Sequence, residues 1–357
     1  MTEMIITGLL CGAVLGFVLQ RGRFCLTGGF RDMYLTKDNR MFYALLLAIA
    51  IQAVGVYALI QFGVLQFAAG TYSWVAVVIG SFVFGIGIIF AGGCATGTWY
   101  RAAEGLIGSW IALIFYMITS AVMKTGILLP VNEKLQGIQV KDNSMANTFG
   151  VSVWLLIALL VVIVAIIMYN QWKKPKVFIP KMKPKRTGLA YHLLERRWHP
   201  FFTASLVGII AIVAWVLSEN TGRMAGLGIT TPTANILQYL VLGDSSFLNW
   251  GVFLVLGLFI GSFIAAKASG EFRLRVPAPK TIVYSLCGGV LMGFGASLAG
   301  GCSIGNGLVQ TAMFTWQGWI SLLFMIFGVW TASYFVFVRP AAKKAGARKA
   351  ATTSVHA

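Results

Sequence analysis

Two copies of one short motif, each centred on a cysteine, carry the clearest chemical signal in the sequence. The first copy, AGGCATG, spans 91–97, and the second, AGGCSIG, spans 299–305. Both interrupt an apolar stretch, and in lipid an irregular backbone is tolerated only where it is buried in protein or lines a water-filled cavity. We therefore take the paired glycines and the cysteine of each copy as candidate site residues: Gly92, Gly93, Cys94, Gly300, Gly301 and Cys302.

These motifs favour recognition of an anion that contains sulfur. A thiol is soft, polarizable and a weak S–H donor. Glycine lets a ligand approach the main chain, and a helix that starts after the break directs its free N–H groups and the positive end of its dipole at the gap. The alternative is close packing of helices at small residues, which does not explain why cysteine occurs at the same place twice.

A third cysteine follows a weaker repeat. The segment GRFC at 22–25 resembles GRMA at 222–225, where Ala225 stands in place of the cysteine. Cys25 therefore has no counterpart, and its position beside Arg23 in a polar segment makes it the third candidate thiol. Polar side chains able to donate hydrogen bonds to oxyanions extend the candidate set: Arg23, Thr96, Asn235 and Asn306.

The remaining cysteines, Cys11 and Cys287, lie within apolar stretches and are expected to be structural. No CxxC spacing and no cluster with histidine occurs, which argues against a disulfide framework or a zinc site. We expect no metal and no cofactor. None of the three histidines falls in a predicted span, so no obvious general base is available and the sequence does not favour an enzyme.

The composition is that of a membrane protein. Of the 357 residues, 58% are hydrophobic and 11% are charged, against about 25% charged in a soluble domain. The apolar residues form stretches long enough to cross ~30 Å of hydrocarbon. We predict an all-α integral membrane protein with about nine transmembrane helices, plus short broken or re-entrant helices at the motifs. The predicted spans are 3–20, 42–62, 73–90, 106–123, 151–170, 201–217, 250–266, 281–298 and 317–338.

The basic residues between these spans predict the orientation. Of the 28 lysines and arginines, 24 fall in one alternate set of loops and tails and 4 in the other. The positive-inside rule then places the N-terminus outside and the C-terminus in the cytoplasm. It also accounts for the net charge of +18 without a nucleic-acid partner.

The motifs recur because spans 1–4 repeat as spans 6–9, with span 5 as a connector. The two repeats start on opposite sides of the membrane, so they are inverted, an architecture of secondary transporters and channels. We divide the chain into an N-terminal repeat with the connector (1–170), a basic cytoplasmic linker (171–199), a C-terminal inverted repeat (200–340) and a basic tail (341–357). The linker is expected to contact anionic membrane lipid; a docking surface for a cytoplasmic partner is the alternative.

From about residue 5 to 338 the chain resembles the YeeE/YedE family of bacterial sulfur-compound transporters. The resemblance is carried by long motifs: GFVLQRGRFCLTGGFRDMY, FAGGCATGTWYRA, ERRWHPF, TGRMAGLGITTPTANILQ and LAGGCSIGNG. It implies a transporter for thiosulfate uptake across the inner membrane, with three functional cysteines that fall on Cys25, Cys94 and Cys302. It also implies that thiosulfate passes along these thiols by S–H···S hydrogen bonds, and that a small cytoplasmic YeeD/TusA-like sulfurtransferase is the partner.

Other functions stay open at this stage. The thiols suit a membrane sulfurtransferase or a persulfide relay, because thiol exchange is available chemistry. A transporter for another sulfur or selenium compound, an anion channel and a structural membrane subunit are further alternatives.

Overall fold

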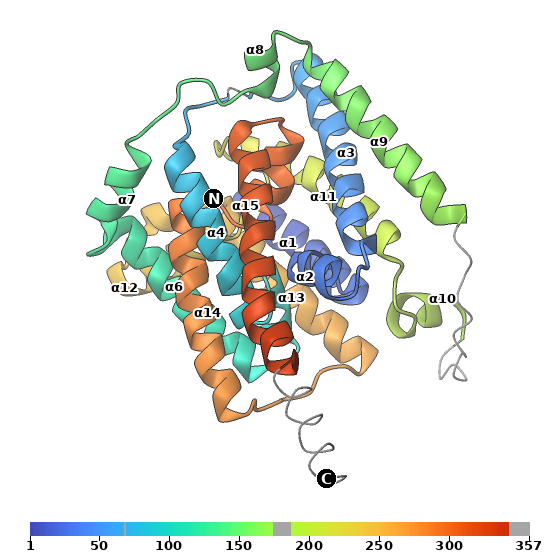
Figure 1. Ribbon diagram of the computed structural model, residues 1–357, viewed down its shortest axis with the longest axis vertical. Helices are drawn as coiled ribbons and strands as arrows, with labels where there is room; N and C mark the ends of the chain where they lie inside the picture. Colours follow the sequence, from blue (N-terminus) through green and yellow to red (C-terminus); the bar gives the residue numbers. More distant parts are fainter. Residues whose placement is uncertain (68, 174–186, 343–357) are drawn as a thin grey trace, which may run out of the picture.

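The computed structural model describes residues 1–67, 69–173 and 187–342. Within these ranges every regular element is a helix, apart from three isolated bridges. Nine helices of the described part are long and apolar enough to cross a membrane, which confirms the predicted all-α membrane fold (Figure 1). They are α1 (Thr2–Gly22), α3 (Arg40–Gln61), α4 (Trp74–Phe90), α6 (Ile107–Thr125), α9 (Val153–Lys173), α11 (Pro200–Glu219), α13 (Trp250–Ser269), α14 (Pro279–Leu298) and α15 (Trp316–Ser333).

Four short helices lie between these long ones at equivalent places in the two repeats. They are α2 (Leu26–Leu35), α5 (Ala95–Ala103), α12 (Thr230–Leu242) and the π-helical η3 (Gly305–Gln310). Both halves therefore have the order long, short, long, long, short, long. The helix contacts match as well: α1 packs on α13 as α11 packs on α3, and α6 packs on α14 as α15 packs on α4. These are the predicted repeats.

The remaining elements connect the repeats or extend them. Between α6 and α9 lie α7 (Leu129–Gln136) and α8 (Met145–Phe149); α10 (Gly188–Ala190) and η1 (Tyr191–Glu195) precede α11, η2 (Ser245–Phe247) precedes α13, and η4 (Tyr334–Val338) continues α15. The connector α9 lies at the side of the bundle along α3 (Figure 1). The domain boundaries stay a proposed division, and parts of the basic linker and tail, 174–186 and 343–357, lie outside the described residues.

The longest helix contact, between α1 and α13, is made by glycines. A Cβ on Gly12 would lie 2.0 Å from the carbonyl oxygen of Leu254, and one on Gly261 would lie 1.9 Å from that of Ala13. The two backbones therefore touch, as small residues allow between membrane helices. Cys11 is buried at 8% exposure beside this contact.

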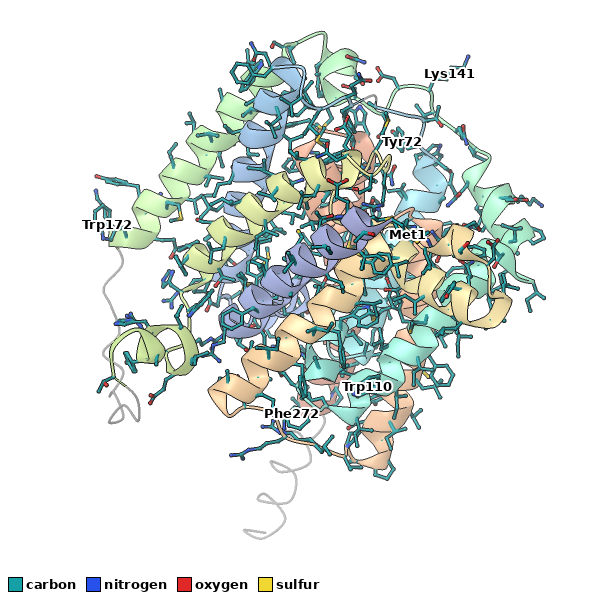
Figure 2. All side chains as sticks on the ribbon, turned by 180° about the vertical axis from the view of Figure 1, so that it is seen from behind. Met1, Tyr72, Trp110, Lys141, Trp172 and Phe272 are labelled. Atoms are coloured by element: carbon teal, nitrogen blue, oxygen red, sulfur yellow. The ribbon has the colours of Figure 1, made fainter. Side chains whose placement is uncertain are left out.

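The loops sort to two opposite ends of the bundle. Figure 2 shows Tyr72 and Lys141 towards one end of the molecule and Trp110 and Phe272 towards the other. The first end carries the segments around α7 and α8, and the second carries the turn from α5 to α6 together with the loop after α13. Leu106 in that turn forms a bridge with Arg275, which ties the two repeats together there.

Candidate functional site

Both AGGC segments form the same turn between a long helix and a short one. The first glycine of each pair has a left-handed backbone, with φ of 71° at both Gly92 and Gly300. This conformation costs an ordinary L-residue about 1–2 kcal/mol, which explains why glycine stands there. After the turn Cys94 is the N-cap of α5, and its Sγ accepts a hydrogen bond of 3.4 Å from the N–H of Gly97.

The two segments that run from the cysteine to the end of the short helical region differ in length by one residue. In the first repeat the chain runs from Cys94 through α5 to the left-handed Gly105, and in the second it runs from Cys302 through η3 to the left-handed Phe314, one residue further on. The π-helical geometry of η3 takes up this additional residue. Such π-helical turns occur frequently at functional sites.

Cys25 and Cys94 come together at the centre of the bundle. Cys25 is the N-cap of α2, and its thiol lies beside that of Cys94. Gly97 lies against both, because a Cβ on it would lie 3.1 Å from the Sγ of Cys25 and 3.4 Å from the Sγ of Cys94. The two short helices α2 and α5 therefore present their starts to one point.

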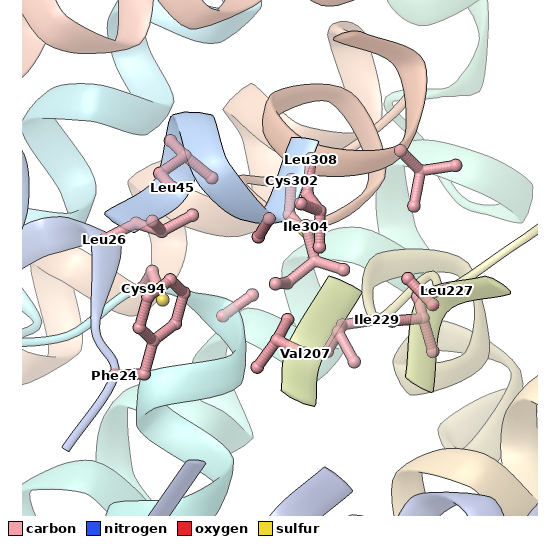
Figure 3. Close-up of a cluster of buried hydrophobic side chains, with 14 of the residues drawn as sticks. Phe24, Leu26, Leu45, Cys94, Val207, Leu227, Ile229, Cys302, Ile304 and Leu308 are labelled. Carbon is pink, nitrogen blue, oxygen red and sulfur yellow. The ribbon is translucent and has the colours of Figure 1, made fainter. Parts of the chain in front are cut away.

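Cys302 belongs to the same buried cluster. Figure 3 shows Cys94 and Cys302 within it, together with Leu26, Ile304 and Leu308. The exposed fractions of the three thiol residues are 5% for Cys25, 2% for Cys94 and 1% for Cys302. Ser303, the neighbour of Cys302, has its side chain beside the thiol of Cys94. The structure thus places Cys25 and Cys94 side by side, and it places Cys302 in the same buried cluster, next to the residue that reaches the Cys94 thiol.

Two cavities approach this cluster from different sides. The Cys302 cavity, about 200 Å³, is lined by Cys302, Gly300, Gly301, Asn306, Arg223 and the start of α12. The Cys25 cavity, about 400 Å³, is lined by Cys25, Tyr100, Arg101, Arg21, Arg23 and Glu271, among others. Within the described part of the chain, no residue lines both cavities and Cys94 lines neither. Cys94 therefore lies in the closed segment between them.

The predicted polar companions have different surroundings. Asn306 supports the second turn, because its Nδ2 donates to the carbonyl oxygen of Ala299 (2.9 Å) and to the Oγ of Ser321 (3.2 Å). Thr96 and Ser303 have buried hydroxyls without a conventional hydrogen-bond partner, so they can serve a passing ligand. Asn235 is buried on α12 and is not among the residues that line either cavity.

Arg23 is held by two carboxylates. Its backbone has a φ of 49°, its Nη1 lies 2.8 Å from Glu104 Oε1, and its Nη2 lies 2.6 Å from Glu271 Oε2. Burial raises the pKa of Glu104 despite the charge of Arg23. Burial also works to raise the pKa of Glu271, but the charges of Arg23 and Arg21 outweigh it and the pKa lies below its ordinary value.

Sequence reasoning missed Gly97 and Tyr116 at this site. Gly97 is part of the repeated AGGCxxG pattern and was available as a signal. Tyr116, in the middle of α6, lies near both Cys94 and Cys302. No pattern in the sequence distinguishes it from other aromatic residues of a span.

The arrangement offers soft S–H groups, main-chain N–H groups and unpartnered hydroxyls in a narrow buried segment between two cavities. These groups can hydrogen-bond the oxygens and the terminal sulfur of a small anion. The three thiol residues of this segment are each at most 5% exposed.

The known proteins that this chain resembles are all named as transporters, and the matching family is described as sulphur transport. The model of a family described as sulphur transport matches residues 21–331. The chain is 64% identical over 343 residues to the thiosulfate transporter TsuA of Escherichia coli K12, covering 96% of this chain and 97% of that protein. It is 33% identical over 350 residues to the thiosulfate transporter TsuA of Spirochaeta thermophila, covering 94% and 100%. A shorter match, 35% identical over 117 residues, links it to the probable transporter YedE of Escherichia coli K12, covering 32% and 28%.

Proposed function

Because this chain belongs to the sulphur transport family, we propose that it is an inner-membrane transporter that takes up thiosulfate as a source of sulfur. The observation that carries the proposal is the arrangement of three buried thiols and two cavities: Cys25 lines one cavity, Cys302 lines the other, and the two cavities share no lining residue in the described structure. A substrate that passes from one cavity to the other must meet these thiols.

The proposed path has four steps. Thiosulfate enters the Cys302 cavity, where Arg223 and the N-terminus of α12 favour an anion. Its terminal sulfur then exchanges S–H···S hydrogen bonds from Cys302 to Cys94 and from Cys94 to Cys25. Gly92, Gly93, Gly300 and Gly301 let the ion approach the main chain, and Thr96 and Ser303 supply hydroxyls. The ion leaves through the Cys25 cavity.

The direction rests on the predicted orientation, with the N-terminus in the periplasm and the basic loops in the cytoplasm. The Cys302 cavity then faces the periplasm and the Cys25 cavity faces the cytoplasm. A dianion that enters against 100 mV pays roughly 4–5 kcal/mol, at about 2.3 kcal/mol per charge. Uptake therefore needs rapid consumption of the product inside, which is the proposed role of a small TusA-like sulfurtransferase bound at the cytoplasmic face.

A flux measurement in proteoliposomes tests this function. Purified protein should catalyse entry of radiolabelled thiosulfate, and Cys94→Ala should abolish it because the closed segment loses its central thiol. Cys287→Ala is the matched control, because Cys287 is exposed on the surface of α14, away from the cluster. Wild-type flux in Cys94→Ala would contradict the proposed path.

Two further measurements separate the alternatives. An excess of sulfate should leave thiosulfate flux nearly unchanged, because sulfate has no terminal sulfur for the thiols; equal transport of both ions would indicate a general anion channel. Mass spectrometry after exposure to thiosulfate should find no stable sulfur adduct on Cys94. A stoichiometric adduct there would favour a persulfide relay, and with it an enzyme rather than a transporter.

A further inference from the structure

The equivalent arginines of the two repeats have different hydrogen-bond and ion-pair partners. Arg23 and Arg223 occupy the same position of the repeated GR segment, and each lines one of the two cavities. The Nη1 of Arg223 donates to neutral acceptors, the carbonyl oxygens of Ala225 and Gly226 (both 2.9 Å) and the Oγ of Ser218. In the described part of the chain Arg223 forms no ion pair with a carboxylate.

Arg23, in contrast to Arg223, forms ion pairs with carboxylates. Its guanidinium lies between Glu104 and Glu271, and Arg21 adds a second contact with Glu271 at 3.3 Å. The amide of Gln20 donates to both carboxylates, at 3.1 Å to Glu104 and 2.8 Å to Glu271. Two positive and two negative groups therefore form one closed cluster at the wall of the Cys25 cavity.

The carboxylates come from parts of the chain that the repeat does not predict. Glu104 lies in the turn between α5 and α6, and Glu271 lies in the loop after α13, where Arg273 and Arg275 hydrogen-bond the backbone of 104–105. Both are thus fixed in place by the main-chain contact between the two repeats. Main-chain hydrogen bonds therefore hold the cluster in a defined position at this end of the protein.

A planar guanidinium binds an oxyanion with the same donors that it uses for a carboxylate. Two uncompensated arginines beside Cys25 would hold a dianion at the end of its path. Conduction requires that binding is strong enough for entry and weak enough for exit. Carboxylates fixed on these donors compete with the substrate and weaken its binding on the exit side alone.

We propose that Glu104 and Glu271 are release residues, which occupy the guanidinium groups of Arg21 and Arg23 so that the transported anion leaves the Cys25 cavity instead of binding there. This inference rests on the proposed uptake of thiosulfate and adds the cause of its exit. The unpaired Arg223 attracts the ion at one end, and its counterpart Arg23, paired with two carboxylates, does not hold it at the other. Arg101, which lines the same cavity as Arg23, instead donates to the carbonyl oxygen of Gly92.

The test variant is Glu271→Gln, because this side chain is 36% exposed and lies in a loop, where an isosteric change is compatible with folding. It leaves one positive charge in the cluster uncompensated. We expect the Kd for radiolabelled thiosulfate on purified protein to fall about tenfold, and KM and kcat for uptake into proteoliposomes to fall together, with a tenfold change equal to ~1.4 kcal/mol. Glu104→Gln should act in the same direction.

Two controls isolate the charge. Asp38→Asn removes an exposed carboxylate that faces Arg40 on the same end of the molecule, and should leave Kd and kcat unchanged. The double variant Glu271→Gln with Arg23→Gln restores charge balance, and should return Kd to within about twofold of wild type. A merely structural role for Glu271 predicts instead that kcat falls without tighter binding, and that the double variant is worse than either change.

Unchanged or weaker thiosulfate binding in folded Glu271→Gln would overturn the inference. If the wild-type protein takes up thiosulfate normally, that result would contradict only the release role of Glu271, and the proposed thiosulfate transport would be unaffected. Absence of wild-type uptake would contradict the proposed function itself, so the two failures are distinguishable.

Discussion

The second glycines of the two AGGC turns make a matched test of the site geometry. Gly93 and Gly301 are equivalent in sequence, and neither has a positive φ. A Cβ on Gly93 would meet Nη1 of Arg101 at 3.4 Å, which is an ordinary contact. A Cβ on Gly301 would lie 2.5 Å from Oδ1 of Asn306 and 2.8 Å from its Cγ. The same substitution therefore fits one turn and collides in the other.

The expected cost of Gly301→Ala follows from these contacts. Inserting a methyl group into a packed site costs about 1–3 kcal/mol. If Asn306 moves aside, its bonds to the carbonyl oxygen of Ala299 and to Ser321 are lost, each worth a net ~1 kcal/mol. The sum is about 3–5 kcal/mol. Gly93→Ala should be neutral or slightly stabilising, because it reduces the entropy of the unfolded chain.

Thermal unfolding of the two purified variants in the same detergent measures this difference. Gly301→Ala should unfold several degrees below wild type, since ~1 kcal/mol shifts the Tm of a larger domain by roughly 2–4 °C, and Gly93→Ala should not. Thiosulfate flux should fall in Gly301→Ala because Cys302 directly follows the displaced turn. Equal Tm values for the two variants, or a larger loss in Gly93→Ala, would refute the reasoning.

Three further outcomes follow from single contacts. Thr233→Val should lower the Tm, because the buried indole N–H of Trp99 loses its 3.0 Å bond to the threonine hydroxyl, at about 1–3 kcal/mol for an unpaired buried donor; an unchanged Tm would contradict this. Gly97→Ala should reduce thiosulfate flux more than Tm, because the added methyl crowds the thiol of Cys25; flux equal to wild type would count against thiol contact. The pKa of Glu271 lies below its ordinary value because arginine charges outweigh burial. Its contribution to stability is therefore present above pH ~4.3 and lost as the pH falls through the lower folded value, so the Tm difference between wild type and Glu271→Gln should vanish in acid and persist at pH 7.

The sequence predicted those parts of the fold that depend on local pattern. Apolar stretches mark the spans because lipid imposes their length and composition. The AGGC copies mark the two turns, since a left-handed residue at the first glycine needs glycine. The repeated motif also predicted the matching order of long and short helices. Each of these signals is contained in a short segment of chain.

Contacts between distant segments were not predictable in the same way. The proximity of Cys25 and Cys94 joins the starts of two short helices, and only the family resemblance, which implies a path along three thiols, suggested that they meet. The contact between Arg23 and Glu271 joins two residues that are 248 positions apart in the sequence. Arg23 was expected to face substrate, and the carboxylates that occupy it have no counterpart in the other repeat. The π-helical turn of η3 likewise depends on one additional residue whose place the sequence does not mark.

The contact between α1 and α13 also bears on how the protein is made. The helix α1, which is synthesised before every other described helix, packs its glycine face against a helix that ends at Ser269. At ~5–20 residues per second, about 250 further residues take roughly 12–50 s to synthesise. During this interval α1 stands in the bilayer with its glycine stripe facing lipid or the insertion machinery. Assembly of the central site is therefore delayed until the second repeat has entered the membrane.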